Sequence, residues 1–224
     1  MNNIKNNINI LKEKIQNLFT NKTELKKFKI VAASKNQSVE KIQMAILCGI
    51  YEFGENYVQE GINKIKKLKK NNKIIWHFIG KLQSRKTKLV AQNFDWCQTI
   101  DREKIAILLN KYRTNKKPPI NVLIQVNISE ETNKNGVSIK NYQKLAITVS
   151  NMPNLKFRGI MAMPKKEQKR IKYCDYQNIK NIFNILKNKY KSVDTLSLGT
   201  SFDIKTAIMY NSNMIRIGKS IFNN

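Results

Sequence analysis

The feature that most constrains the fold is an alternation of eight short apolar runs with segments whose apolar residues recur at helical spacing. The runs span residues 28–34, 51–54, 74–79, 94–100, 120–128, 155–163, 193–198 and 214–217. Strands that are apolar on both faces are typical of a parallel sheet covered by helices. The number eight favours a closed (β/α)8 barrel of the TIM type over an open doubly wound sheet.

The segments between these runs have the pattern of amphipathic helices. In the first, the apolar stripe consists of Ile4, Ile8, Leu11, Ile15 and Leu18. Ser38 and Asp101 are predicted to cap the N-termini of two later helices, and further helices are expected over 138–151 and from Asp203. No linker interrupts the alternation, so residues 1–224 are expected to form a single barrel domain.

Hydropathy and cysteine usage indicate the cellular compartment in which the chain is expected. No run approaches the roughly 18 to 20 apolar residues of a membrane span, and polar residues interrupt the beginning of the chain where a signal peptide would be apolar. Cys48, Cys97 and Cys174 are widely spaced, which supports neither a disulfide framework nor a zinc finger. We expect a cytoplasmic protein without a membrane partner or a metal site.

The net charge of +27 allows two interpretations. A polyanion such as a nucleic acid is the first, because basic proteins attract phosphates. The second is codon bias: 36 Lys, 30 Asn and 31 Ile residues share A+T-rich codons, whereas the six Arg are few. The densest basic run, residues 64–73, contains no aromatic ring and is interpreted as a solvated helix face. We expect no specific nucleic-acid partner.

Two loops near the end of the chain are candidates for binding a phosphate. Active sites of such barrels lie at the carboxyl ends of the strands, and phosphates often bind to the loops after strands 7 and 8. The seventh run is followed by Leu198–Ser201 and the eighth by Arg216–Lys219, each with a glycine that lets backbone N–H groups approach a ligand.

Lys35 directly follows the first strand, which adjoins the eighth in a closed barrel. This position predicts that its amine lies over the barrel mouth. Partial desolvation there would favour the neutral amine, which is the nucleophilic form. A nucleophilic lysine beside a phosphate site suggests an aldehyde-bearing phosphate cofactor held as an imine.

Several motifs resemble those of the pyridoxal phosphate homeostasis proteins, also called the proline synthetase co-transcribed family. The resemblance covers nearly the whole chain. It rests on Val31–Lys35 (VAASK), Phe53–Glu60 (FGENYVQE), Trp76–Gly80 with Leu82 and Gln83, Gly159–Met163 (GIMAM), Leu196–Gly199 with Ser201 and Asp203, and Ile215–Gly218 (IRIG). One departure is Asn211, where the family commonly has glycine; asparagine tolerates positive φ better than most residues.

The resemblance implies a barrel like the N-terminal domain of alanine racemases and a set of cofactor contacts. Lys35 would carry pyridoxal 5′-phosphate (PLP) as an internal aldimine, and Arg216 would face the pyridine nitrogen. Ser201 and the backbone at Gly218 would bind the phosphate, while Asn56 would lie near the ring. The implied role is intracellular PLP (vitamin B6) homeostasis, linked to amino-acid metabolism, with PLP-dependent apo-enzymes as recipients.

The chemistry of Arg216 bears on catalysis. A permanently charged guanidinium disfavours a proton on the pyridine nitrogen and so weakens carbanion stabilisation. We therefore predict little or no catalytic activity and assign no catalytic residue. One alternative is a PLP-dependent amino-acid racemase, although racemases of this fold take a second base from an additional domain and a partner subunit. The other is the basic nucleic-acid-binding protein. A monomer is expected.

The remaining candidates receive structural interpretations. His77, the sole histidine, is interpreted as a buried, hydrogen-bonded strand residue, because one histidine builds no three-histidine metal site. Glu55 and Glu60 could be acid–base groups, but acids at a helix start usually complement the helix dipole. Cys97 is expected in the core.

Overall fold

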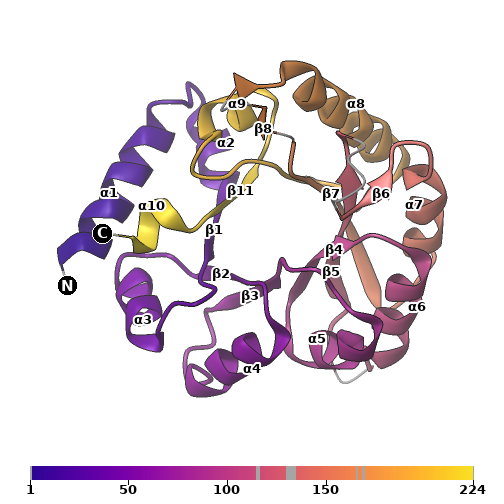
Figure 1. Ribbon diagram of the computed structural model, residues 1–224, viewed down its shortest axis with the longest axis horizontal. Coiled ribbons are helices and arrows are strands. Elements are labelled where there is room, and N and C mark those ends of the chain that lie inside the picture. Colours follow the sequence, from indigo (N-terminus) through magenta and orange to yellow (C-terminus); the bar gives the residue numbers. More distant parts are fainter. Residues whose placement is uncertain (1, 115–116, 130–134, 165, 168–169, 224) are drawn as a thin grey trace.

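Eight parallel strands form a closed ring in the computed structural model, which describes residues 2–114, 117–129, 135–164, 166–167 and 170–223 (Figure 1). The strands are β1 Lys29–Ala33, β2 Glu52–Glu55, β3 Ile75–Phe78, β4 Trp96–Ile100, β5 Ile120–Asn127, β7 Leu155–Ala162, β10 Thr195–Ser197 and β11 Met214–Ile217. They pair in the order β4-β3-β2-β1-β11-β10-β7-β5, and β4 also pairs with β5. The predicted (β/α)8 barrel is confirmed.

Helices surround this ring (Figure 1). They are α1 Asn2–Gln16, α2 Lys22–Lys27, α3 Val39–Leu47, α4 Val58–Lys67, the short 3-10 helix η1 Ser84–Lys86, α5 Thr87–Asn93, α6 Glu103–Tyr112, α7 Tyr142–Ser150, α8 Tyr173–Lys189, α9 Ile204–Met209 and α10 Lys219–Phe222. Within the described residues, no helix combines the length and apolar character needed to cross a bilayer.

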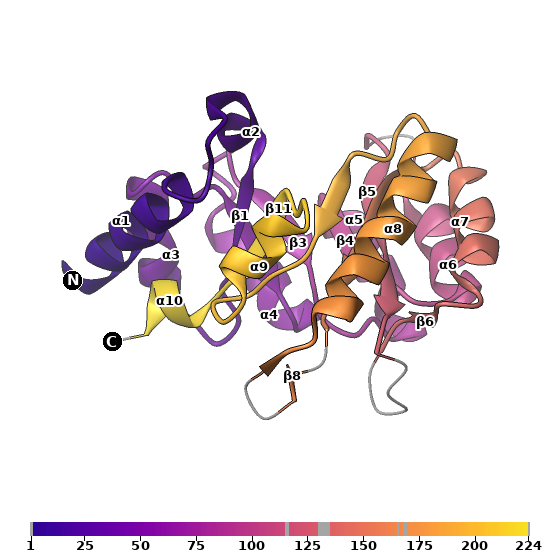
Figure 2. The same cartoon turned by 90° about the horizontal axis from the view of Figure 1, so that it is seen from above.

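Three short strands were not predicted. Val137–Ser138 (β6) pairs with the end of β5, while Lys166–Glu167 (β8) and Arg170–Ile171 (β9) form an antiparallel pair of their own. In Figure 2, β6 and β8 lie at one end of the barrel and α2 lies at the other. Because α2 precedes β1 whereas β6 and β8 follow strands, the first end is the carboxyl face and the second the amino face.

Alternation along the strands divides the core in two. Residues that point outward meet the helices, where the stripe of α1 is buried as predicted, with Ile8 and Leu11 at 0% and 3% exposure. Inward residues form a separate cluster of Val31, Trp96, Leu123, Met161 and Met214. Burying each large apolar side chain stabilises the fold by about 1.5–3 kcal/mol, so the two layers hold the ring closed.

At the helix N-termini, one predicted cap is confirmed, one predicted cap is wrong, and one predicted helix start is wrong. Ser38 caps α3 as predicted, because its Oγ accepts the N–H of Lys41 at 3.4 Å. Asp101 is not a cap: α6 begins at Glu103 after Arg102, and the Asp101 carboxylate instead accepts from the Arg102 guanidinium at 2.6 Å. The helix predicted over 138–151 begins only at Tyr142, since residues 137–138 form β6.

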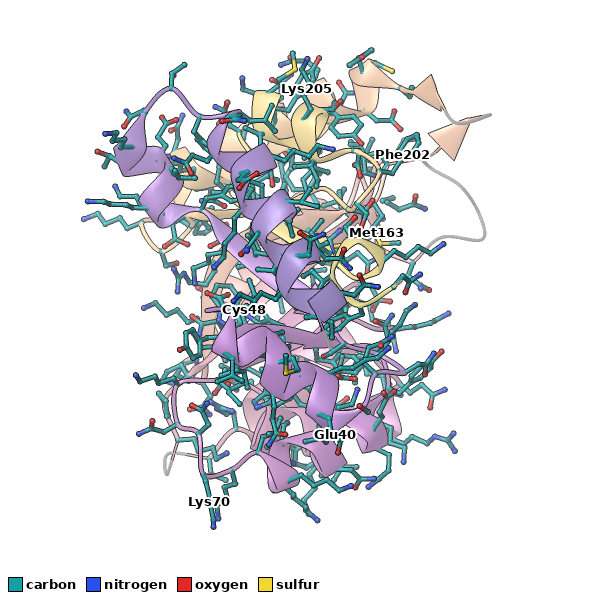
Figure 3. All side chains as sticks on the ribbon, turned by 90° about the vertical axis from the view of Figure 1, so that its left-hand side faces the viewer. Glu40, Cys48, Lys70, Met163, Phe202 and Lys205 are labelled. Atoms are coloured by element: carbon teal, nitrogen blue, oxygen red, sulfur yellow. The ribbon has the colours of Figure 1, made fainter. Side chains whose placement is uncertain are left out.

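Basic side chains project from many sides of the molecule. In Figure 3, nitrogen-tipped side chains surround the outline, and Lys70 and Lys205 lie at opposite ends of the view. Both of these lysines are exposed. This spread matches the codon-bias interpretation of the net charge better than a single basic stripe. The predicted domain range of 1–224 includes Met1 and Asn224, which lie outside the described residues.

Candidate functional site

Arg216 lies inside the barrel at the carboxyl end of β11. It is 6% exposed, so its charge is buried and does not project into solvent from the strand end. Its Nη1 donates to Ser197 Oγ at 2.5 Å and its Nη2 donates to the Ala162 carbonyl at 3.0 Å. Burial lowers the pKa of the guanidinium to about 10, and the charge of Asp203 opposes this shift. A buried cation at a barrel mouth is ready to face a polar ligand.

The pairing of β1 with β11 brings Arg216 next to the strand that leads to Lys35. Val31 is in register with Arg216, and Ala32 with Ile217. Gly218 continues β11 against the end of β1, so that a Cβ there would lie 3.3 Å from the Ala33 carbonyl oxygen. A glycine at this point therefore keeps the two strand ends in close approach.

Lys35 occupies the second position of a β-turn after β1. Gln37 N–H donates to the Ser34 carbonyl at 3.0 Å, and Asn36 has a left-handed φ of 59°. This conformation suits asparagine at the third position of a type II turn. The Lys35 side chain is exposed, so the partial burial predicted for its amine is not present.

A buried ionic group, which we call the Lys64 cluster, holds the backbone on both sides of Lys35. Its members are Lys64, Glu55, Glu60, Ser34 and Asn36. Lys64 Nζ donates to Glu55 at 2.8 Å, to Glu60 at 2.6 Å and to the Ser34 carbonyl at 2.6 Å. Ser34 Oγ donates to Glu55 at 2.6 Å, and Asn36 N–H donates to Glu60 at 2.6 Å. The turn is therefore fixed while the Lys35 side chain remains free.

The Lys64 cluster corrects two predictions. Lys64 is 5% exposed, so the run 64–73 is not solvated throughout. Glu55 ends β2 and pairs with Lys64, so it is not an acid at a helix start. Glu60 also pairs with Lys64, but it lies in the first turn of α4, where an acid complements the helix dipole as predicted. Burial is the largest influence on Glu55 and raises its pKa, although Lys64 opposes the shift. One sequence signal was available: Lys64 lies four residues before buried Leu68, on the inward stripe of α4.

The loop after β10 is ordered by Asp203. This buried carboxylate accepts both the N–H and the hydroxyl of Thr200, at 2.8 and 2.7 Å, and the Tyr176 hydroxyl at 2.5 Å. Burial and the contact with Asp203 raise the pKa of Tyr176. Ser201 reaches the other loop, where its Oγ accepts the Ser220 N–H at 3.4 Å. The two predicted phosphate loops therefore adjoin.

Asn56 follows β2 and is half-buried. It lines a hollow of about 400 Å³ together with Phe78, Gly80 and Lys81, among others. A Cβ on Gly80 would lie 2.0 Å from the Asn56 carbonyl oxygen, so only glycine permits this approach of the β2 and β3 loops.

All five predicted binding residues lie at one end of the barrel. Asn56, Lys35 and Ser201 follow β2, β1 and β10, while Arg216 lies near the end of β11 and Gly218 follows it. These four strands are consecutive neighbours in the sheet. Together they present a primary amine, a guanidinium, an amide, a hydroxyl and backbone N–H groups. His77 and Cys97 are buried as predicted, and burial raises the pKa of the Cys97 thiol to about 11.

Comparisons with known proteins identify the family and the fold of the chain. Residues 1–223 match the family described as alanine racemase, N-terminal domain. A pyridoxal phosphate homeostasis protein of Buchnera aphidicola subsp. Schizaphis graminum is 66% identical over 100% of this chain and 99% of its own length.

Two solved structures share the fold. One is the structure of PipY from Synechococcus elongatus PCC7942 with PLP bound, which is 22% identical and has a TM-score of 0.83. The match covers 98% of this chain and 100% of that one. An alanine racemase of Clostridium difficile 630 is 14% identical with a TM-score of 0.74. That match covers 100% of this chain but 57% of the racemase.

Proposed function

The chain belongs to the family of pyridoxal phosphate homeostasis proteins, within the alanine racemase N-terminal domain fold, and on this premise we propose that it binds PLP through Lys35 and acts in PLP homeostasis. The observation that carries the proposal is the pairing of β1 with β11, which brings the Lys35 turn beside a buried guanidinium. In this site, Lys35 would supply the amine, Arg216 would face the ring nitrogen and Asn56 would lie near the ring.

The donor set fits this cofactor. Gly218 leaves the space of a side chain beside Ala33, at the point where a phosphate would meet backbone N–H groups. Ser201 lies on the adjoining loop. Arg216 is buried against neutral partners, Ser197 Oγ and the Ala162 carbonyl, and so has charge left to interact with a polar ring atom.

Lys35 would hold the cofactor covalently: its neutral amine would bond to the aldehyde carbon as an imine, and the aldehyde oxygen would leave as water. The Lys64 cluster holds the backbone of Ser34 and Asn36, so that the amine is presented from a fixed turn. When bound, the cofactor supplies an aldehyde and an electron-accepting ring.

The proposed role is retention and delivery, with little or no catalysis. A guanidinium facing the ring nitrogen disfavours its protonation and weakens the ring as an electron acceptor. Holding the aldehyde as an imine masks its reactivity toward other amines. The recipients would be PLP-dependent apo-enzymes in the cytoplasm, and we propose that a monomeric single domain performs this role.

Absorption spectroscopy with borohydride trapping tests the proposal. We expect the purified protein, or the protein after addition of PLP, to absorb in the visible range, and peptide mass analysis after reduction to place a pyridoxyl group on Lys35. The Lys35→Ala variant should lose the absorption, while Lys66→Ala, exposed on α4, should retain it. A colourless protein that takes up no PLP would overturn the proposal, and rapid racemisation of an amino acid would favour the racemase alternative.

A further inference from the structure

A continuous line of polar side chains, which we call the interior chain, crosses the inside of the barrel. It consists of Arg216, Ser197, Gln98, His77 and Glu52, from β11, β10, β4, β3 and β2. The contacts in that order measure 2.5, 2.7, 2.9 and 3.0 Å. Because β4 and β10 are not neighbours in the sheet, the Gln98–Ser197 bond spans the barrel interior.

The chemistry of the groups fixes the direction of every hydrogen bond. A guanidinium can only donate, so Ser197 Oγ accepts from Arg216 and directs its own proton to Gln98 Oε1. The Gln98 amide nitrogen then faces His77 Nδ1, which must accept. The other imidazole nitrogen, Nε2, carries the proton and donates to the Glu52 carboxylate. Every hydrogen bond of the interior chain is therefore donated in the same direction, from the Arg216 cation toward the Glu52 anion.

The surroundings of His77 agree with a neutral ring. Its side chain is fully buried, and Trp96 stacks on it with ring centroids 5.2 Å apart. Glu52 is also bound by Lys29 at 3.0 Å, which offsets the negative charge facing the imidazole. Burial lowers the pKa of His77, against the opposing influence of Glu52.

The two ends of the interior chain lie on opposite faces of the barrel. Arg216 is at the carboxyl mouth, whereas Glu52 and Lys29 line a cavity of about 720 Å³ that Phe28 and Ile50 place on the amino face. Glu52 is partly exposed there, with 16% of its side chain accessible. The charge of Arg216 is thus linked through three neutral side chains to a carboxylate that water can reach.

We infer that Ser197, Gln98 and neutral His77, protonated on Nε2, are positioning residues that orient Arg216 for the pyridine ring through the interior chain. The inference rests on the proposed function for its ligand, but the protonation pattern is a property of the protein alone. Arg216 Nη1 has its orientation set by Ser197, and Ser197 can accept from it only while Gln98 receives the serine proton. His77 in turn keeps the Gln98 amide from rotating, because Nδ1 accepts from its nitrogen.

The first arm of the test uses nitrogen NMR of protein without added cofactor. His77 is the sole histidine, so the imidazole signals need no further assignment. We expect a neutral ring with a protonated Nε2 and a hydrogen-bonded, unprotonated Nδ1. In Gln98→Glu, a carboxylate replaces the donor opposite Nδ1, so the ring should become doubly protonated. A wild-type ring that is charged or protonated on Nδ1, or a ring that ignores Gln98→Glu, would overturn the inference.

The second arm measures PLP affinity by absorbance titration. His77→Leu leaves Gln98 and Glu52 without their partner and should weaken binding about tenfold. His77→Gln keeps one acceptor and one donor, so it should remain within about threefold of wild type. Met161→Leu, an apolar change inside the same barrel, serves as the matched control.

The two arms separate failure of the inference from failure of the proposed function. Wild-type protein that binds no PLP while His77 shows the expected protonation would refute PLP binding and leave the interior chain standing. Equal affinities for His77→Leu, His77→Gln and wild type would overturn the positioning role. If His77→Leu does not fold, Ser197→Ala takes its place in the titration, because it removes the acceptor of Arg216 Nη1, and wild-type PLP affinity in that variant would overturn the positioning role.

Discussion

The interior chain and the Lys64 cluster serve neighbouring parts of one site by different physical means. The Lys64 cluster is ionic: one buried cation binds two carboxylates and a carbonyl between the sheet and α4. The interior chain separates its charges, so that three neutral side chains lie between Arg216 and Glu52. The first fixes the backbone beside Lys35, while the second orients a side chain.

This difference shows how the barrel can hold the exposed Lys35 side chain and a buried cation at the same end. Lys64 is paired with two carboxylates within the cluster. Arg216 keeps its positive charge available at the mouth, because its partners are a hydroxyl and a carbonyl. Four predictions test the comparison, from the largest expected effect to the smallest.

Lys64→Met should give the largest loss of stability. Removing one partner of a buried ion pair leaves the charge of Glu55 uncompensated, which costs about 3–5 kcal/mol. Glu55 Oε2 already lacks a hydrogen-bond partner among the described residues, so few donors would remain to stabilise the carboxylate. Urea unfolding measures the effect, and Lys66→Met on the exposed side of α4 is the control. A loss below about 1 kcal/mol would contradict a structural role for the cluster.

Ser197→Ala should interrupt the interior chain at a smaller cost. The change leaves one N–H of Arg216 and the oxygen of Gln98 without partners, and each unpaired buried polar group costs about 1–3 kcal/mol. Ser150→Ala, whose exposed hydroxyl donates to the Ile147 carbonyl in its own helix at 3.0 Å, is the control. If both variants unfold at the same urea concentration, the interior chain does not contribute to stability.

The contributions of the two networks to the free energy of unfolding should change with pH in opposite directions. The folded-state pKa of His77 is lowered, so its contribution is present above about pH 6.5 and decreases as the pH falls. The folded-state pKa of Glu55 is raised, so its contribution is present below about pH 4.3 and decreases as the pH rises. His77→Gln and Glu55→Gln should each remove one of these slopes from the urea unfolding free energy. Slopes of the same sign would refute the comparison.

Glu60→Gln should have the smallest effect. Glu60 is only half-buried, and partly exposed pairs contribute about 1 kcal/mol or less. The amide oxygen can still accept from Asn36 N–H, so the turn should persist with a weaker hold. We expect a minor shift in urea unfolding and a measurable change in the rate at which borohydride traps PLP on Lys35. Glu13→Gln, on the exposed face of α1, should change neither quantity.

The fold could be predicted because its signals are local. Each strand is a short apolar run, and Lys35 and Arg216 can be placed from their positions at strand ends alone. Asn211 is a small example of the same kind: its φ of 65° fits the expectation that asparagine replaces a glycine there.

The polar networks could not be predicted because they depend on partners far away in the chain. Lys64 is buried only because Glu55 and the Ser34 carbonyl meet it, and the sequence separation of 30 residues to Ser34 hides that contact. The Gln98–Ser197 bond joins residues 99 positions apart. Asp101 shows that a neighbouring residue can also defeat a prediction. Its carboxylate binds the guanidinium of the next residue, Arg102, and does not cap the helix.

The pairing of β1 with β11, which closes the ring, determines when the barrel can form during synthesis of the chain. A ribosome adds about 5–20 residues per second, so the Lys35 turn is made roughly 10–40 seconds before Arg216. Until β11 arrives, β1 lacks one of its two neighbours and the mouth lacks its guanidinium. A nascent chain would therefore expose Lys35 without Arg216, and the candidate site would be complete only when synthesis of the last strand allows the barrel to close.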